Sequence, residues 1–231
     1  MSTVWCEVVV ARYEEDLRWV RRIPSGFGVR VYNKGPEVER WPVHGGLVAE
    51  GLRNVGREAQ TYLHHLVTRY ERLAEVTVFV QGKPFDHVPD LHGRLRNWAE
   101  GRDKVEDFRW LGFMIDREDE EGSLFLNWSK NPNRERLPLA AFWSRVWEEP
   151  MPEAFVFYPG GNFAVTAECV RRRSRGFYER ALAVSEEVEH AAHCFERTWD
   201  KVFGVNGIPE AQRGREYPVY MKPIRRLGNG E

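Results

Sequence analysis

A polar segment that follows a short apolar run holds the residues best suited to chemistry. The run Val76–Val80 is β-branched and aromatic, which predicts a buried strand. The segment Gln81–His87 then brings an amide, a glycine, a cation, a carboxylate and an imidazole close together. Open α/β sheets bind ligands outside the carboxyl ends of their strands. We therefore expect Asp86 and His87 to lie in a site, where they could hold a divalent cation such as Mn²⁺ or Mg²⁺.

Each candidate residue also has a purely structural interpretation. Asp86 could cap a turn, and His87 could be a packed or surface histidine. Arg57 could be an ordinary first-turn residue on the surface of a helix. Gly160 and Gly161 could let the backbone pass close to a ligand, or they could merely turn the chain. The residue types alone leave both interpretations open.

Three polar turns would meet if the first three predicted strands are parallel. They are Arg12–Asp16, Asn33–Gly35 and Gln81–His87. A nucleotide-sugar site needs a carboxylate or amide for the base and ribose, and N–H groups or cations for the diphosphate. It usually also needs a bound divalent ion to stabilise the leaving phosphate. Arg12 or Arg57 could contact phosphate, and the helix that starts near Asn54 would add a partial positive charge.

A second candidate cluster lies near the carboxyl end of the chain. His190, His193 and Glu196 have i, i+3, i+6 spacing, so a helix would present them along one face. With Glu186 or Glu187 they could form a metal site. A His- and Glu-rich exposed helix face explains the same spacing without any metal.

A third cluster, Asp116, Glu118 and Asp119, could hold a divalent cation through its hard oxygen atoms. A solvated acidic loop is the other interpretation of such a charge run. The sequence contains no GxSxG, GxGxxG or GxxxxGK[ST] motif. It therefore gives no support for Ser/His/Asp catalysis or for a glycine-rich phosphate loop.

The first part of the chain alternates predicted strands and helices. Val4–Ala11 and Gly28–Tyr32 are strands, and helical spacing is present over Leu17–Ile23. A polar connection then leads to about Leu52, and an amphipathic helix follows with Asn54 as its N-cap. Together with the strand before Gln81, this order predicts a parallel sheet with right-handed crossovers.

Shorter elements are expected in the remainder of the chain. The longest is a single helix over 177–201, and the tail that follows residue 204 is expected to be irregular. The others are a polar helix or loop over 92–106, an apolar run over 110–115, a helix within 131–154, strands over 155–158 and 162–165, and a helix over 167–173.

Composition limits the possible partners and location. The chain has 231 residues and a net charge of −1, so no overall field attracts it to nucleic acid. No apolar segment approaches the roughly 18 residues of a membrane span, and no leader peptide is apparent. The cysteines Cys6, Cys169 and Cys194 form no CxxC pair, which suits a reducing compartment. We expect a cytoplasmic protein without a membrane span or a nucleic-acid partner.

Six segments occur in a characteristic order between Val8 and Gly204. They are VVVARYEEDLRWV, VYNKG, RNVGREAQTYLHHLVTRY, VTVFVQGKPFDH, GGNFAV and CFERTWDKVFG. Together they resemble the family catalogued as domain of unknown function 3431, and that family distantly resembles the GT-A-fold glycosyltransferases. This chain has QGKPFDH where those enzymes carry a metal-binding Asp-X-Asp. The resemblance implies that Asp86 and His87 replace that motif, or that the protein is metal-independent or inactive.

The resemblance implies an α/β, GT-A-like (Rossmann-like) fold, with a mostly parallel sheet flanked by helices and an irregular C-terminal part. One domain would then comprise a nucleotide-binding half over 1–100, an acceptor-side half over 101–204 and an irregular tail over 205–231. The implied activity is transfer of a sugar from a nucleotide-sugar donor to a carbohydrate or other small acceptor. Fold resemblance does not by itself establish that activity.

The site residues follow from the resemblance and from the three turns. Asp86 and Glu196 are the catalytic candidates, with Glu196 as general base, and Asp86 and His87 are the metal ligands. Nucleotide contacts are expected from Arg12, Tyr13, Glu15, Asp16, Asn54, Gly56, Arg57, Gln81 and Gly82. Acceptor contacts are expected from Gly160, Gly161, Asn162 and Phe163.

Two other functions remain open from the sequence. One is a metal-dependent hydrolase that uses His87, His190, His193 and Glu196. The other is a non-catalytic carbohydrate-binding domain that has kept the fold without the Asp-X-Asp motif.

Overall fold

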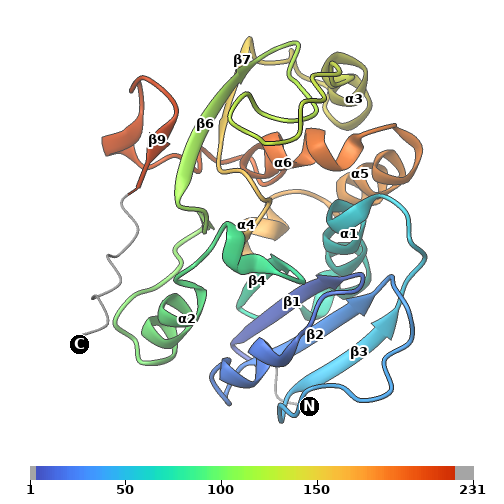
Figure 1. Ribbon diagram of the computed structural model, residues 1–231, viewed down its shortest axis with the longest axis vertical. Coiled ribbons are helices and arrows are strands. Elements are labelled where there is room, and N and C mark those ends of the chain that lie inside the picture. The colour runs from blue at the N-terminus through green and yellow to red at the C-terminus, as the bar shows by residue number, and fades with distance from the viewer. Residues whose placement is uncertain (1–3, 222–231) are drawn as a thin grey trace.

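The computed structural model describes residues 4–221, and its centre is a six-stranded, mostly parallel sheet of order β3-β2-β1-β4-β8-β5 (Figure 1). Strand β8 runs antiparallel to β4, and β5 runs antiparallel to β8, while the first four strands are parallel to one another. The strands are β1 (Cys6–Arg12), β2 (Gly28–Asn33), β3 (Leu47–Gly51), β4 (Val76–Gln81), β5 (Phe108–Trp110) and β8 (Phe163–Thr166).

Strand β1 shows why the run of consecutive valines lies at the centre of the sheet. The side chain of Val9 packs into one core cluster, whereas Val8 and Val10 pack into a second cluster on the opposite face. All three side chains are fully buried. Strands that are covered on both faces have nearly continuous apolar runs, which is the pattern of Val8–Val10.

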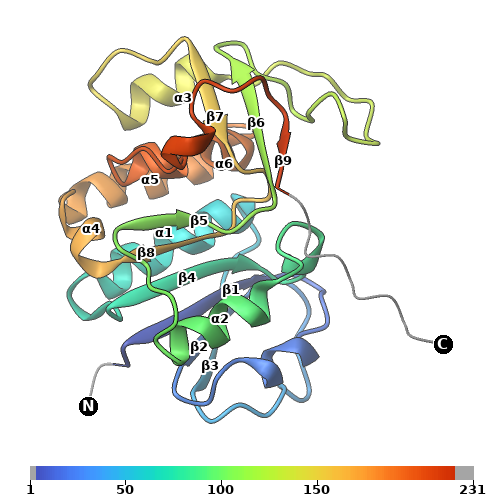
Figure 2. The same cartoon turned by 90° about the vertical axis from the view of Figure 1, so that its left-hand side faces the viewer.

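Helices cover both faces of this sheet (Figure 2). On one face lie α1 (Arg57–Arg69), α5 (Arg175–Glu187) and α6 (Ala191–Val202). On the other face lie the 3₁₀ helix η1 (Arg18–Arg22) and α2 (Leu91–Ala99). The remaining helical elements are η2 (Tyr70–Arg72), η3 (Pro84–Asp86), α3 (Leu139–Val146), α4 (Ala167–Arg171) and η4 (Glu210–Gln212).

A second, antiparallel sheet has the order β7-β6-β9. It consists of β6 (Met114–Asp119), β7 (Ala154–Phe157) and β9 (Val219–Tyr220), and it lies beside α3 and α6 in Figure 1. Among residues 4–221, no helix is long and apolar enough to span a bilayer.

The predicted alternation of strands and helices is confirmed for the first part of the chain, with three corrections. Strand β3 lies in the stretch predicted to be a polar connection, because an edge strand is half exposed and carries no long apolar run. The predicted helix over Leu17–Ile23 is only the 3₁₀ helix η1. The N-cap of α1 is Gly56 in a left-handed conformation, and not Asn54.

The second half differs from the prediction in three further places. The single helix predicted over 177–201 is divided into α5 and α6 by His190, whose φ is 58°. The apolar run over 110–115 is divided between β5 and β6, which belong to different sheets. The predicted irregular tail contains η4 and the short strand β9. Residues 222–231 of that tail lie outside the described residues.

The turns after β1 and β2 meet at a glycine. A Cβ atom on Gly35 would lie 1.6 Å from the carbonyl oxygen of Tyr13, so only glycine allows the two backbones to approach this closely. We predict that Gly35→Ala lowers the free energy of unfolding by about 3 kcal/mol or more, because backbone atoms must move apart. Denaturation by urea measures the change.

Gly45→Ala is the matched control, because no atom lies within 4 Å of the added Cβ. Its effect on the unfolding midpoint should be small. Equal midpoints for the two variants would contradict the close approach of the two turns.

Candidate functional site

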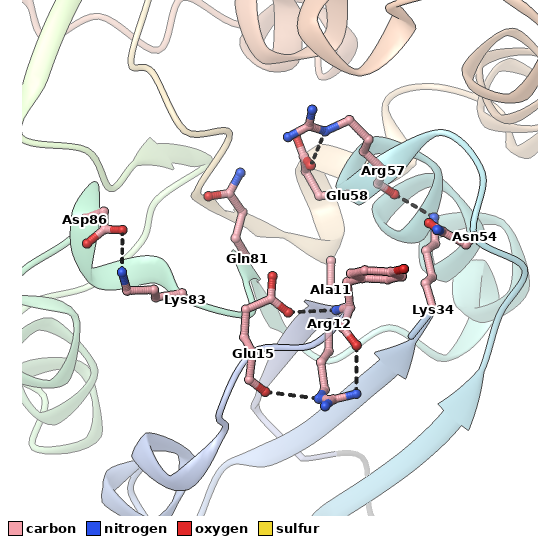
Figure 3. A pocket seen from close by; sticks show the side chains of 11 residues that line it. Ala11, Arg12, Glu15, Lys34, Asn54, Arg57, Glu58, Gln81, Lys83 and Asp86 are labelled. Carbon is pink, nitrogen blue, oxygen red and sulfur yellow. Dashed lines mark hydrogen bonds and ion pairs between the residues drawn. The ribbon is translucent and has the colours of Figure 1, made fainter. Parts of the chain in front are cut away.

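A cavity of about 470 Å³ opens at the carboxyl ends of β1, β2 and β4 (Figure 3). The chain leaves β1 toward β2 on one side, whereas it leaves β4 toward α2 and β5 on the other side. Such a point, where the strand order reverses, is where open α/β sheets bind ligands. The cavity is lined by Ala11, Arg12, Tyr13, Glu15, Lys34, Asn54, Arg57, Glu58, Gln81, Lys83 and Asp86.

Lys34, the first residue after β2, is a buried cation in the wall of this cavity. The residue is only 8% exposed, and its Nζ donates hydrogen bonds of 2.6 Å to the carbonyl oxygens of Val55 and Arg57. Burial lowers the pKa of Lys34 to about 8, although the charges of Glu58 and Glu186 raise it. An ammonium group carries three N–H donors, and these two carbonyls account for two of them.

The start of α1 forms the wall next to Lys34. Gly56 and Arg57 both have positive φ values, of 59° and 49°. Arg57 is not a glycine, so this conformation is strained, and such strain often marks functional segments. Glu186 at the end of α5 holds the same region, because it accepts hydrogen bonds from Arg53 and Gln60. The first-turn N–H groups of α1 therefore lie at a rigidly held cavity wall.

Arg12 organises the turns after β1 and β2. Its Nη1 donates to Asn33 Oδ1 at 2.6 Å and to the carbonyl oxygen of Tyr13 at 2.9 Å, and its Nε donates to the carbonyl oxygen of Glu15. The guanidinium also lies 5.8 Å from the ring centre of Trp41. These contacts are with neutral groups, so the Arg12 side chain brings positive charge to the cavity while it fixes both turns.

Glu15 and Gln81 lie between the two ends of the cavity in Figure 3. The Oε2 atom of Glu15 accepts a hydrogen bond of 2.7 Å from the Tyr13 N–H group. The backbone N–H of Gln81 donates to Oδ1 of Asn162 at 3.1 Å. Asn162 is only 1% exposed, so it fixes the end of β4 from inside the core.

Lys83 and Asp86 lie at the opposite end of the cavity from Lys34 (Figure 3). Lys83 Nζ and Asp86 Oδ2 are 3.0 Å apart, and the two side chains are 68% and 64% exposed. Exposed ion pairs of this kind are weak and are easily exchanged for other partners. The neighbouring His87 ring rests against the backbone of Gly160.

Glu196 is joined to Gly160 as well. The N–H group of Gly160 donates to Glu196 Oε1 at 2.5 Å, and Arg197 Nη1 lies 3.1 Å from Oε2. Burial raises the pKa of Glu196, but the neighbouring His193, the charge of Arg197 and the Gly160 hydrogen bond together lower it to about 2. The side chain is a well-held anion beneath the turn at Gly160.

The sequence model of one protein family matches residues 8–216, and the family is described as "Protein of unknown function (DUF3431)". The chain belongs to this family. No match was found among the curated proteins.

In this DUF3431 member, most of the predicted nucleotide-contacting residues lie in one cavity wall. Those that line it, together with the catalytic candidate Asp86, are Arg12, Tyr13, Glu15, Asn54, Arg57 and Gln81. Asp16 is exposed and binds Arg18 instead. Gly56 precedes the lining residue Arg57, and Gly82 is buried next to the Glu15 carboxylate.

The predicted acceptor residues are not exposed in the cavity. Gly160, Gly161, Asn162 and Phe163 are all buried, and the Phe163 ring packs in the core against Trp199. Sequence reasoning did not assign a site role to Lys34 or Lys83. The signal that could have identified them was present, because both residues lie in turns expected to meet at the cavity.

The candidate metal clusters of the sequence do not come together. Across residues 4–221, no three His, Cys, Asp or Glu side chains are grouped so that they could hold a metal ion. His190 is the N-cap of α6 and pairs with Glu135, whereas His193 pairs with Glu196. Asp116 instead accepts a hydrogen bond of 2.6 Å from the indole N–H of Trp128.

The Gly160 turn gives a direct stability prediction. Gly160 has a φ of 97°, and a Cβ added to it would lie 2.4 Å from Cγ of His87. Gly101 has a φ of 66° but nothing within 4 Å of an added Cβ. We expect Gly101→Ala to lower the free energy of unfolding by about 1–2 kcal/mol, the cost of the left-handed conformation.

Gly160→Ala should lower the free energy of unfolding by about 1–3 kcal/mol more than Gly101→Ala does, because the His87 ring must also move. Chemical denaturation of both variants tests the difference. A Gly160→Ala variant that is no less stable than Gly101→Ala would show that the His87 ring is not held by this turn.

Lys34 makes the stability of the protein depend on pH in the alkaline range. Its folded pKa of about 8 is below its ordinary value of 10.5. Between these values the unfolded chain binds more protons than the folded protein, so the Lys34 contribution rises with pH. The stability of the wild type relative to Lys34→Met should therefore increase above pH 8, by at most about 1.4 kcal/mol per pH unit.

Urea denaturation at several pH values measures this difference. Lys104→Met is the control, since the Lys104 side chain is 80% exposed and its variant should show no comparable slope. If the difference in free energy of unfolding between the wild type and Lys34→Met does not change with pH, the Lys34 ammonium is as well solvated as an ordinary surface lysine.

Proposed function

We propose that this protein transfers a glycosyl group from a nucleoside-diphosphate sugar to an acceptor hydroxyl, and that its sheet belongs to the GT-A type. The acceptor oxygen would bond to the anomeric carbon and give up its proton to a base, while the bond from that carbon to the diphosphate breaks and the nucleoside diphosphate leaves. The observation that carries the proposal is the cavity at the reversal of strand order, which combines a buried cation at one end with an exposed carboxylate at the other.

The Lys34 end of the cavity suits a diphosphate. Its ammonium is buried among carbonyl oxygens, which carry only partial charge, so a bound phosphate would supply the full negative charge that the group lacks. Arg57 is next to it, with a side chain that is 63% exposed and lies 3.7 Å from Glu58, a weak contact that a phosphate could replace. The N-terminus of α1 adds its partial positive charge.

A nucleoside has suitable partners at the ends of β1 and β4. The Tyr13 side chain is exposed and offers an aromatic face on which a base can stack. The carboxylate of Glu15 can accept hydrogen bonds from ribose hydroxyls, and the amides of Gln81 and Asn54 can both donate and accept. These contacts leave the sugar of the donor to extend toward Asp86.

A divalent cation fits this proposal through Asp86. Mg²⁺ is commonly held by one or two carboxylates together with the phosphates of a substrate. Asp86 lines the cavity, is exposed, and forms the weak pair with Lys83 that is described above. The ion would neutralise charge on the leaving diphosphate. In its absence, Lys83 is a cation that lies 3.0 Å from the Asp86 carboxylate.

The placement of Glu196 supports a positioning role rather than that of general base. A base works best when its pKa lies near the working pH, and the pKa of Glu196 is lowered to about 2. Its carboxylate accepts the N–H of Gly160, and Gly160 supports the His87 ring. We infer that Glu196 fixes the turn on which His87 rests.

The proposal is tested by thermal unfolding of the full chain with UDP-, GDP-, ADP- and CDP-sugars, each with and without Mn²⁺. A ligand that binds only the folded protein raises the unfolding midpoint. At a hundredfold excess over Kd, the expected increase is about 5 °C or more for a chain of this size. The sugars of one nucleotide should give this increase in the midpoint, and those of the other three nucleotides should give a smaller increase. No increase with any nucleotide would refute the proposal.

Two pairs of variants test whether the increase in the unfolding midpoint depends on this cavity. Lys34→Met should abolish the shift, whereas Lys104→Met, which removes an exposed ammonium, should leave it unchanged. Asp86→Asn should remove any dependence on Mn²⁺, whereas Asp90→Asn should not. Asp90 lies on the same segment but is paired with Arg94 and does not line the cavity.

A further inference from the structure

A second, smaller cavity of about 130 Å³ lies on the other side of Asp86. Its lining is mainly aromatic and apolar, with Phe113, Trp128 and Tyr220 as its aromatic residues. Besides the aromatic residues, Asp86 and His87 contribute polar side chains to its wall. The cavity resembles in size an apolar cavity of roughly 150 Å³ that accepts one benzene ring. It therefore has room for one six-membered ring.

Trp128 is held in place as an exposed ring. Trp128 is 44% exposed, yet its indole Nε1 donates a hydrogen bond of 2.6 Å to Oδ2 of Asp116. Asp116 is only 7% exposed, so this bond joins the ring to a fixed carboxylate. A large exposed aromatic ring that is fixed in this way is a preorganised binding surface.

Tyr220 provides a second exposed aromatic side chain. It lies on β9, which pairs with Met114 of β6, and the residue is 57% exposed. Two aromatic residues with this much exposure in one small cavity leave apolar surface that the described residues 4–221 do not cover. Asp86 and His87 add a carboxylate and an imidazole to the wall of the same cavity.

We propose that this cavity binds the acceptor of the transfer reaction, as a pyranose ring whose C–H face packs on Trp128 and whose hydroxyl groups meet Asp86 and His87. The negative face of an aromatic ring attracts the polarised C–H groups of a sugar. An aromatic acceptor with a single hydroxyl would satisfy Trp128 but would leave either the carboxylate or the imidazole without a hydroxyl partner. This inference rests on the proposed function, because it places the acceptor next to the donor sugar at Asp86.

The geometry of the two cavities supports this arrangement. Asp86 is the residue that lines both of them. The nucleotide would enter from the side of Lys34 and Tyr13, so the transferred sugar would reach Asp86 from one direction and the acceptor hydroxyl from the other. The transferred sugar and the acceptor hydroxyl would then lie next to each other beside the Asp86 carboxylate.

The test is saturation-transfer NMR on the full chain with methyl β-D-glucopyranoside, methyl β-D-galactopyranoside and methyl α-D-mannopyranoside. At least one of them should receive saturation at the C–H protons of one ring face. Trp128→Ala should reduce that signal by at least about fivefold, and Trp128→Phe should keep most of it. Trp5→Ala is the control, since Trp5 is exposed to a similar extent, 40%, but lies outside both cavities.

Circular dichroism and the unfolding midpoint confirm that each variant is folded, and the nucleotide-dependent midpoint increase should be unchanged in Trp128→Ala. Pyranoside binding that depends on Trp128 supports the inference even if no nucleotide binds, a result that would refute only the transferase proposal. Nucleotide binding without any pyranoside binding overturns the inference. A saturation-transfer signal of equal size in Trp128→Ala and the wild type would also overturn the inference. Binding of benzyl alcohol in place of the pyranosides would do the same.

Discussion

The burial of one ammonium group, that of Lys34, determines how the candidate site is built. Moving a charged group out of water is unfavourable unless other groups replace its hydration. Here the replacement comes from the carbonyl oxygens of Val55 and Arg57, which lie at the start of α1. The pKa of Lys34, lowered to about 8, shows that this replacement is incomplete. The wall of the cavity is therefore preorganised for an anion before any ligand is present.

The strained start of α1 is linked to the same interaction. Arg57 has a φ of 49°, and its carbonyl oxygen is one of the two acceptors for Lys34. Glu186 holds the opposite side of this segment through Arg53 and Gln60. An unusual backbone conformation persists only where its surroundings enforce it. Lys34, which follows β2, and Glu186 of α5 enforce the left-handed conformation here. They connect the cavity to the central sheet and to the helices on one of its faces.

The sequence predicted the positions of most strands better than it predicted the tertiary contacts of single side chains. The valine run of β1 could be identified because it is a continuous β-branched apolar stretch. The polar turn after β4 could be identified because open α/β sheets bind ligands at the carboxyl ends of their strands. The role of Lys34 could not be identified, because a lysine after a strand does not reveal that its ammonium will be buried. His190 likewise carries no sequence signal for a left-handed conformation, so the break between α5 and α6 was missed. Glu196 was predicted from the sequence to be a general base, whereas its hydrogen bond from Gly160 and its lowered pKa support the positioning role proposed above.

The two sheets contribute different chemistry to the region around Asp86. The carboxyl ends of β1, β2 and β4 supply charged and amide groups, which suit a phosphate-bearing ligand. The second sheet supplies Met114 from β6 and Tyr220 from β9, which suit an apolar ring face. Since Lys83 and Asp86 form only an exposed pair, a diphosphate could draw Lys83 away and leave the carboxylate available at the boundary. A polar donor and a partly apolar acceptor would then be sorted to opposite sides of Asp86 by polarity alone, before any specific recognition of either.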